Sequence, residues 1–210
     1  MSYYPIMLDV KGKRCVVIGG GQVALRKAQS LLECGAAVEI ISPELCPGLE
    51  ELVSSGSVKA VLRPYRRSVI KGAALVVAAA DDGEVNRSVS EEAAESGIPV
   101  NVVDVPGLSS FIVPSSLRRG DLTIAVSTNG KSPALARRIR AELEESIGEE
   151  YSLLTSLAEE LRSELKREGI SVPPEAWQEA LELDALLDLL RSGRRDEARQ
   201  RLSESLRKHG

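Results

Sequence analysis

Three consecutive glycines, Gly19 to Gly21, are the clearest chemical signal in this chain of 210 residues. The β-branched apolar run 14–18 leads directly into them, and a helix-like segment from Ala24 to Cys34 follows. In this strand–turn–helix context Gly19 permits a tight turn, Gly21 lets a pyrophosphate approach the backbone, and Ala24 lets helix and strand pack closely. The free N–H groups at the helix start favour phosphate. The pattern therefore predicts a dinucleotide-binding site.

A second cofactor position is expected where the next strand ends, in the run Ser42, Pro43 and Glu44. An acid near this point usually binds the ribose hydroxyls, and no arginine or lysine follows closely enough to favour a 2′-phosphate. We therefore expect NAD rather than NADP as the cofactor. Glu44 comes a little later than is usual. A second interpretation makes it a helix-start carboxylate that complements the dipole of the following helix.

Two further strand ends carry polar residues. Small residues at 79–80, with Asp81 next, leave room beside Ala80 for a nicotinamide ribose, and Asp82 is expected to cap the next helix. The following strand contains Asn101 and ends at Asp104, on the sheet edge where ligands bind. A carboxylate beside a nicotinamide can act as a general base. Physical chemistry alone leaves Asp104 open between a base and a turn-forming aspartate.

A polar loop, residues 127–133, leads into a helix that Pro133 opens. Hydroxyls such as that of Thr128, free backbone amides around Asn129 and the Lys131 ammonium suit a carboxylate ligand. Arginines 137, 138 and 140 follow in the helix. Such a run of arginines is more often a solvated helix face than a ligand site.

The elements that must position these residues alternate in type from residue 14 to 105. Apolar runs predict strands at 14–18, 37–41, 58–62, 74–78 and 99–103, with helices at 22–34, 44–55 and 84–96. Gly35 and Gly97 stand where helices end. Right-handed crossovers then give an α/β fold with a Rossmann-like, doubly wound parallel sheet.

After residue 105 the pattern changes. Two strands are expected at 111–114 and 122–127 around a turn at 118–121, followed by a helix to about 147. Three helices should follow: one from Tyr151 to Leu165, one carrying Trp177 to Leu190, and one from Asp196 to Leu206. We expect an NAD-binding domain at 1–111, a small α/β dimerisation and substrate segment at 112–147, and a helical domain at 148–210.

The composition limits the class of protein. The net charge of −4 and the pI near 5.3 disfavour general nucleic-acid binding, and no apolar run approaches the roughly 20 residues that span a bilayer. The start of the sequence has no secretory pattern. Three cysteines without a CxxC pair fit a reduced, cytoplasmic protein. The only histidine is His209, so we expect neither histidine catalysis nor a metal site.

Several separated segments resemble the precorrin-2 dehydrogenase family, which forms the N-terminal module of sirohaem synthases. They lie in order from about residue 3 to 147: 8–13, 17–28, 79–82 with Asn86, 101–104, 110–114 and 127–136. Beyond residue 147 the chain is similar only in being helical. That tail is too short for the methyltransferase module of the fused enzymes, so methyltransferase activity is not expected.

The resemblance implies NAD-dependent oxidation of precorrin-2 to sirohydrochlorin by a homodimer. It implies that Asp104 is the catalytic carboxylate, and that NAD contacts Gln22, Val23, Pro43 and Glu44. It also implies that the 127–133 loop, with Asn129 in place of a common glycine, lies by the tetrapyrrole site, where Asn101, Thr128, Asn129 and Lys131 would bind substrate. Because the substrate carries eight carboxylates, a basic rim of Lys131, Arg118, Arg119 and Arg137 would suit it.

Two other functions remain compatible with the sequence. Some relatives also insert iron into sirohydrochlorin, and Asp104 could take the pyrrole protons in that reaction; otherwise a separate chelatase would be a partner. A non-catalytic NAD-sensing module would share the glycine pattern. It would not explain the segments at 101–104, 110–114 and 127–133.

Overall fold

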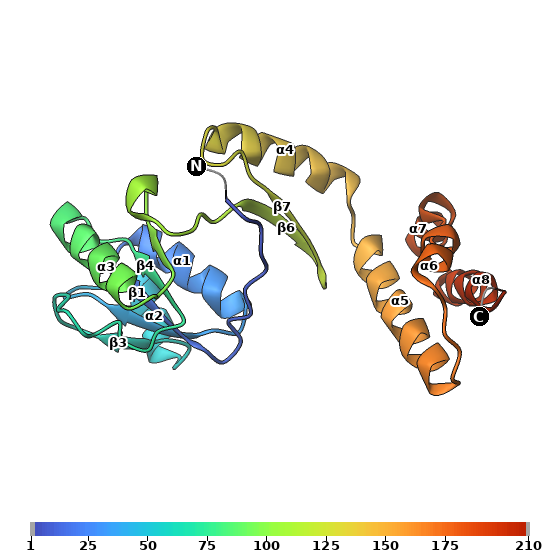
Figure 1. The fold of residues 1–210 in the computed structure, drawn as a ribbon, viewed down its shortest axis with the longest axis horizontal. Helices are drawn as coiled ribbons and strands as arrows, with labels where there is room; N and C mark the ends of the chain where they lie inside the picture. Colours follow the sequence, from blue (N-terminus) through green and yellow to red (C-terminus); the bar gives the residue numbers. More distant parts are fainter. Residues whose placement is uncertain (1–2, 209–210) are drawn as a thin grey trace. The chain divides into compact units, whose positions relative to one another are not determined.

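The computed structural model describes residues 3–208, so His209 lies outside the described residues. The chain divides into two compact units, residues 1–113 and 114–210. Each unit has its own apolar core and is described by itself (Figure 1).

The first unit is built on a five-stranded parallel sheet with the strand order β3-β2-β1-β4-β5. The strands are β1 (Arg14–Ile18), β2 (Ala37–Ile41), β3 (Lys59–Val61), β4 (Leu75–Ala78) and β5 (Val100–Val102). The helices are α1 (Gln22–Glu33), α2 (Pro47–Ser54) and α3 (Gly83–Glu95), with a short 3₁₀ turn, η1 (Pro106–Leu108). The order reverses between β1 and β4, so the predicted doubly wound, Rossmann-like fold is confirmed.

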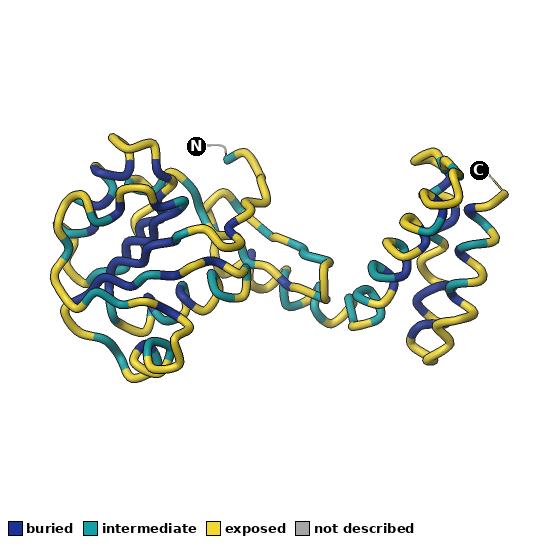
Figure 2. The backbone as a smooth tube through the Cα atoms, turned by 90° about the horizontal axis from the view of Figure 1, so that it is seen from below, coloured by how far each residue is buried: buried dark blue, intermediate teal, exposed yellow. Residues whose placement is uncertain are grey.

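The sheet lies between two apolar layers. One cluster joins alternate residues of β1, β2 and β4 to α1 and α2, and the other joins the opposite face to α3 and the segment before β4. Figure 2 shows the strands as the buried centre of this unit. Burial on both faces explains why the strand sequences are continuous apolar runs.

Helix α2 begins later than the predicted position 44. Cys46 precedes Pro47, which disfavours helical backbone at Cys46, and Cys46 is extended with φ −72° and ψ 157°. Its N–H donates to the Gly20 carbonyl at 2.8 Å. Glu44 therefore lies in the loop before α2, and its interpretation as a helix-start carboxylate is wrong.

The second unit begins with an antiparallel hairpin, β6 (Ser115–Arg119) and β7 (Leu122–Val126), packed against α4 (Pro133–Ser146). The strand predicted at 111–114 is wrong, since β6 starts at Ser115. The register pairs Arg119 with Leu122, so the turn consists of only two residues, Gly120 and the one after it. Strand β6 therefore continues to Arg119, directly before this turn. Pro114 has no N–H to give to the ladder.

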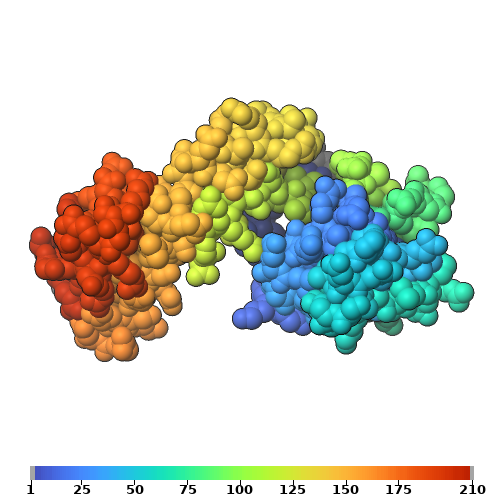
Figure 3. Space-filling model, turned by 180° about the vertical axis from the view of Figure 1, so that it is seen from behind, coloured from blue at the N-terminus to red at the C-terminus, as the bar shows by residue number. Residues whose placement is uncertain are grey.

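The rest of the second unit is helical: α5 (Glu150–Arg167), α6 (Pro174–Ala180), α7 (Leu183–Arg191) and α8 (Arg195–Arg207). Leucines and alanines from these helices form a third apolar cluster, and α6 to α8 form one closely packed mass in Figure 3 (orange to red). The single helix predicted from Trp177 to Leu190 is two helices, because Leu181 and Glu182 have ψ values of 65° and 80°. Neither glycine nor proline marks this break.

Candidate functional site

The glycine loop connects β1 to α1 and contacts two neighbouring strand ends. Gly19 has φ +124°, and a Cβ there would lie 2.3 Å from the Ala79 carbonyl oxygen. A Cβ on Gly20 would lie 1.8 Å from the Glu44 carbonyl oxygen. At Gly21 a Cβ would meet no described atom within 4 Å. Gly19 and Gly20 are therefore required by packing, whereas Gly21 borders open space.

The start of α1 can receive an anion. Gly21 is its N-cap, no side chain among the described residues caps it, and the first turn, which includes Gln22 and Val23, holds no acid. The fully buried Ala24 and Ala28 hold the helix against the sheet. Among residues 3–208 the first backbone N–H groups of α1 therefore have no acceptor, which is the arrangement that binds phosphate.

The end of β2 places Ser42, Pro43 and Glu44 beside this loop. Ser42 is buried and its N–H donates to the Val61 carbonyl at 3.3 Å, while Pro43 and Glu44 are exposed. The Glu44 carbonyl packs against Gly20, which brings this segment next to the glycine loop.

The end of β4 is held by Asn86 of α3. The Asn86 amide accepts from the Ala80 N–H at 3.1 Å and donates to the Ala80 carbonyl at 2.7 Å. Asp82 caps α3, as predicted, by accepting from the Glu84 N–H at 2.8 Å. Asp81 is exposed beside Ala80. The backbone at Ala80 is thus fixed where the strand order of the sheet reverses.

Asp104 follows β5 at the carboxyl edge of the sheet, exposed, in a turn closed by the 3.2 Å bond from the Val105 N–H to the Val102 carbonyl. Its φ of +60° is a left-handed conformation that aspartate tolerates better than most residues. The buried Asn101 donates its amide N–H to the Phe111 carbonyl at 3.1 Å. Asn101 therefore fixes the segment that returns after the Asp104 turn.

The serines at 109 and 110 tie the Asp104 loop to β5. The Ser109 hydroxyl accepts from the Val102 N–H at 2.9 Å, and the Ser110 hydroxyl accepts from the Val100 N–H at 2.8 Å. The Ser110 N–H donates to the Val100 carbonyl at 2.9 Å. These hydrogen bonds anchor the loop that contains Asp104 to β5, the strand at the edge of the sheet.

Lys27 is a charged residue near this edge that the sequence did not single out. It lies on α1, is half-buried, and interacts electrostatically with Asp104. Burial is the main cause that lowers the pKa of its ammonium, the neighbouring Arg26 charge lowers it further, and Asp104 acts in the opposite direction.

These features fit a nicotinamide dinucleotide. A side chain at Gly20 would collide with the Glu44 backbone, the start of α1 is open to an anion, and the strand ends at Ser42 and Ala80 lie on either side of β1. In Rossmann-like sheets the phosphates of such a cofactor bind at the turn after the first strand and at the start of the next helix, which in this chain are residues 19–23.

The loop predicted to bind carboxylate lies in the second unit, between β7 and α4. The Thr128 hydroxyl accepts from the Ser132 N–H at 2.9 Å, and Ser132 caps α4 by accepting from the Leu135 N–H at 3.2 Å. Asn129, with φ +53°, adopts the conformation that a glycine would also take, and it is exposed beside Lys131.

The arginines of the predicted basic rim differ in their surroundings. The Arg119 guanidinium donates to the Ile147 carbonyl at 3.0 Å and lies 3.4 Å from a Glu149 oxygen, so it closes the end of α4. Arg138 and Arg140 pair with Glu142 and Glu144 on the same helix. Lys131 and Arg137 are exposed. Arg119 should therefore be left out of the expected rim.

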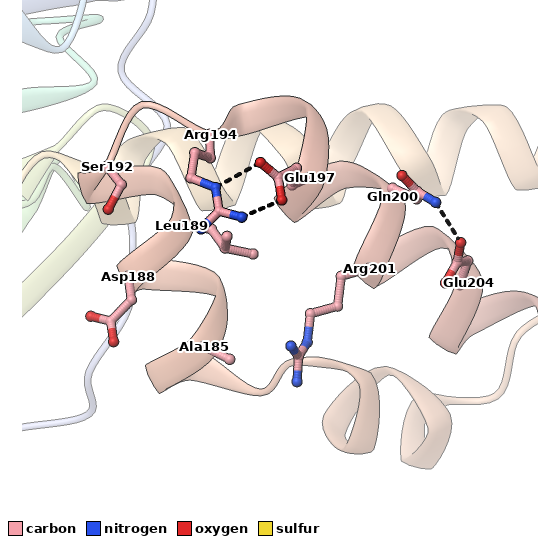
Figure 4. A pocket seen from close by; sticks show the side chains of 9 residues that line it. All are labelled: Ala185, Asp188, Leu189, Ser192, Arg194, Glu197, Gln200, Arg201 and Glu204. Atoms are coloured by element: carbon pink, nitrogen blue, oxygen red, sulfur yellow. Dashed lines mark hydrogen bonds and ion pairs between the residues drawn. The ribbon is translucent and has the colours of Figure 1, made fainter.

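A groove of about 540 Å³ lies between α7 and α8, apart from every predicted site residue (Figure 4). Four of its polar side chains bind one another in pairs: Arg194 pairs with Glu197, and Gln200 donates to Glu204 at 2.8 Å. Within residues 3–208, no group of three potential metal ligands is present, and no helix is long and apolar enough to cross a bilayer.

Two family models match the chain. One, described as "Putative NAD(P)-binding", matches residues 6–115, and one described as "Sirohaem biosynthesis protein central" matches residues 119–146.

Curated relatives match nearly the whole chain. A siroheme synthase of Thioalkalivibrio sulfidiphilus is 39% identical over 208 residues, which are 98% of this chain and 42% of that protein. One from Stutzerimonas stutzeri is 38% identical over 208 residues, 98% of this chain and 44% of the relative. The chain thus spans less than half the length of these relatives, and the similarity includes the helical tail.

A solved structure entitled "SirC, precorrin-2 dehydrogenase" covers 96% of this chain and 100% of its own, with a TM-score of 0.72 and 26% identity. The architecture of both units is therefore shared with a chain of known structure.

Proposed function

Since the chain belongs to the family of NAD(P)-binding proteins of sirohaem biosynthesis, we propose that it dehydrogenates precorrin-2 to sirohydrochlorin. One observation carries the proposal: the open start of α1 and the Asp104 carboxylate lie at the same carboxyl edge of one parallel sheet.

The reaction removes two electrons and two protons from the tetrapyrrole. A bound nicotinamide would accept a hydride, and the remaining proton needs a base. Asp104 is exposed, held on a fixed turn, and free of any hydrogen bond or ion pair to the described residues. It can therefore accept that proton without first breaking a contact with those residues.

NAD is the cofactor we propose over NADP. The segment after β2 offers the Ser42 hydroxyl and the Glu44 carboxylate beside the glycine loop, and no cation lies between residues 42 and 58. A 2′-phosphate there would meet a carboxylate without a neighbouring positive charge. Titration of the protein with NAD and NADP by calorimetry should give the tighter Kd for NAD.

The loop with Thr128, Asn129 and Lys131 is proposed to bind carboxylates of the substrate. The support is its exposed ammonium, its left-handed backbone at Asn129, and the start of α4 that follows it. Replacement of Lys131 by Met should raise the KM for precorrin-2 and leave the Kd for NAD unchanged.

A homodimer is proposed to form through residues 112–147. Of the residues in β6, β7 and α4, only Leu117 and Ala136 are buried, whereas Leu135 and Ile139, one turn apart on α4, are 51% and 36% exposed. A second copy packed on this face would cover the apolar side chains that the hairpin and α4 leave exposed. Sedimentation should show a dimer that Leu135→Glu dissociates.

We also propose a cytoplasmic location, because the substrate and NAD are intracellular metabolites and the cysteines form no CxxC pair. Cell fractionation tests this.

The function is tested anaerobically, with precorrin-2 generated in situ, purified protein and NAD, followed by absorbance. We expect sirohydrochlorin only when NAD is present. Asp104→Asn should lower kcat by about 100-fold or more with unchanged NAD affinity, since general bases contribute 10²–10⁴-fold. Asp196→Asn, an exposed aspartate of α8, is the matched control and should be fully active.

The result against the proposal would be a folded, NAD-binding wild-type protein that forms no sirohydrochlorin, which would favour an NAD sensor. Addition of Fe²⁺ after the oxidation tests for chelation. Sirohaem formed faster than the spontaneous reaction would add that activity, and sirohaem at the spontaneous rate would point to a separate chelatase.

A further inference from the structure

The Lys27 side chain projects from α1 next to the helix face that packs on the sheet. Ala24 and Ala28, three positions before and one after it, are fully buried. A side chain between two such positions starts close to the packed face and must pass along it to reach water. Lys27 is accordingly half-buried, although it is a lysine on an outer helix.

The chain after β5 comes to the same face of the sheet. Val103 and Phe111 pack against the apolar cluster that contains Ala24 and Ala28. Asp104 stands between these two contacts in the sequence, and its carboxylate interacts electrostatically with the Lys27 ammonium. The Asp104 turn therefore lies on the side of the sheet that α1 covers, close enough for the two charges to interact.

The Lys27 ammonium is available for a ligand in the folded chain. Among the interactions of residues 3–208, it makes neither a hydrogen bond nor an ion pair within 4 Å. Burial is the main cause that lowers its pKa, as expected for a cation that is partly withdrawn from water without a hydrogen-bonded partner, and Asp104 acts in the opposite direction. Such a cation is stabilised by any anion that comes within hydrogen-bonding distance.

We infer that Lys27 binds a carboxylate of the tetrapyrrole next to Asp104, and so orients the macrocycle at the reacting edge. This inference rests on the proposed function. A substrate with eight carboxylates supplies the missing anion. The cofactor phosphates are expected at the start of α1, whereas Lys27 lies five residues, about 7.5 Å along the helix axis, beyond Gln22 and interacts with Asp104.

The test measures binding of sirohydrochlorin, without NAD, to the wild type and three variants under anaerobic conditions. Lys27→Met should weaken binding about tenfold, and Lys27→Arg should retain it within about threefold, because a charge-assisted hydrogen bond contributes that much at a partly exposed site. Arg26→Met, which removes the exposed neighbouring cation, is the matched control and should bind like the wild type. The Kd for NAD should not change in any of them.

A second readout follows the Lys27 amine by NMR in the protein without ligands. Asp104→Asn should lower the pKa of Lys27 and Arg26→Met should raise it, since these two charges act on it in opposite directions. Sirohydrochlorin should raise it in the wild type.

Equal binding by Lys27→Met and the wild type, with a Lys27 pKa that sirohydrochlorin leaves unchanged, would overturn this inference alone. A wild-type protein that binds NAD but no sirohydrochlorin would overturn the proposed function, and the role of Lys27 with it.

Discussion

Replacement of single glycines in the β1–α1 loop by alanine should affect the stability of the fold at one position and cofactor binding at the next. Gly20→Ala places a methyl group against the backbone of the segment after β2, whereas Gly21→Ala places it in open space. Both changes add the same group one residue apart. We expect Gly20→Ala to destabilise the first unit, and Gly21→Ala to weaken NAD binding in a protein of nearly unchanged stability.

The geometry gives the size of the effect. A Cβ on Gly20 would lie 1.8 Å from the Glu44 carbonyl oxygen, where 3.0 Å is the closest approach that real proteins show, so the two segments must separate by about 1.2 Å. Overpacking costs about 1–3 kcal/mol. The movement also stretches the 2.8 Å bond from the Cys46 N–H to the Gly20 carbonyl, which contributes about 1 kcal/mol. We expect a loss of about 3 kcal/mol in the free energy of unfolding.

Amide hydrogen exchange can report this loss for one unit at a time. A loss of about 3 kcal/mol should raise the exchange rate of the β1 amides by about 100-fold in Gly20→Ala. The amides of α5, in the second unit, should exchange at the wild-type rate and serve as the internal control. In Gly21→Ala the β1 rates should change by less than about threefold, and calorimetry should show a weaker Kd for NAD.

If the β1 amides of Gly20→Ala exchanged at the wild-type rate, the argument that the Glu44 carbonyl excludes a side chain at this position would be refuted. Equal destabilisation by both alanines would show instead that the whole loop requires glycine backbone.

Three further changes test other contacts. Asn86→Ala should lower the free energy of unfolding, measured by urea titration, by about 1–3 kcal/mol and weaken NAD binding, because the Ala80 N–H and carbonyl lose their partner; Asn86→Asp keeps the acceptor and should lose less. Burial and the hydrogen bond to Glu92 raise the pKa of the Tyr65 phenol, so the folded protein keeps a proton that the unfolded chain loses near pH 10. Stability should therefore fall as the pH rises above about 10, and denaturant titrations between pH 8 and 11 should show a smaller fall in Tyr65→Phe. Asn129→Ala should cost about 1 kcal/mol at its left-handed position, seen as faster amide exchange in α4, while Asn129→Gly should be neutral.

Most of the first unit could be predicted because its strands are buried on both faces. Apolar runs of four or five residues flanked by glycine gave strand positions that agree with the structure within one or two residues. The start of α2 could not be read in the same way, since it depends on the conformation that Pro47 imposes on Cys46. The break at Leu181 and Glu182 has no local signal, because apolar residues continue at helical spacing through it.

The local backbone geometry around the candidate site could be predicted from the sequence, whereas several of its side-chain contacts could not. The glycine loop and Asp82 follow from rules of local backbone geometry, so the sequence was enough for them. Arg119 looked like a ligand for carboxylates, but its partner is a carbonyl 28 residues away at the end of α4. Lys27 looked like an ordinary helix-surface lysine. Only the fold shows that the turn after β5 comes to its side.

The serine contacts along β5 restrict how copies of this chain can associate. All four outward-facing backbone groups of Val100 and Val102 are bound to the Val105, Ser109 and Ser110 region. An outer strand with unpaired N–H and carbonyl groups can recruit a strand from another molecule, and this one has none to offer. The sheet therefore cannot be extended into a continuous intermolecular sheet at β5, and any contact between copies at this edge has to be made by side chains.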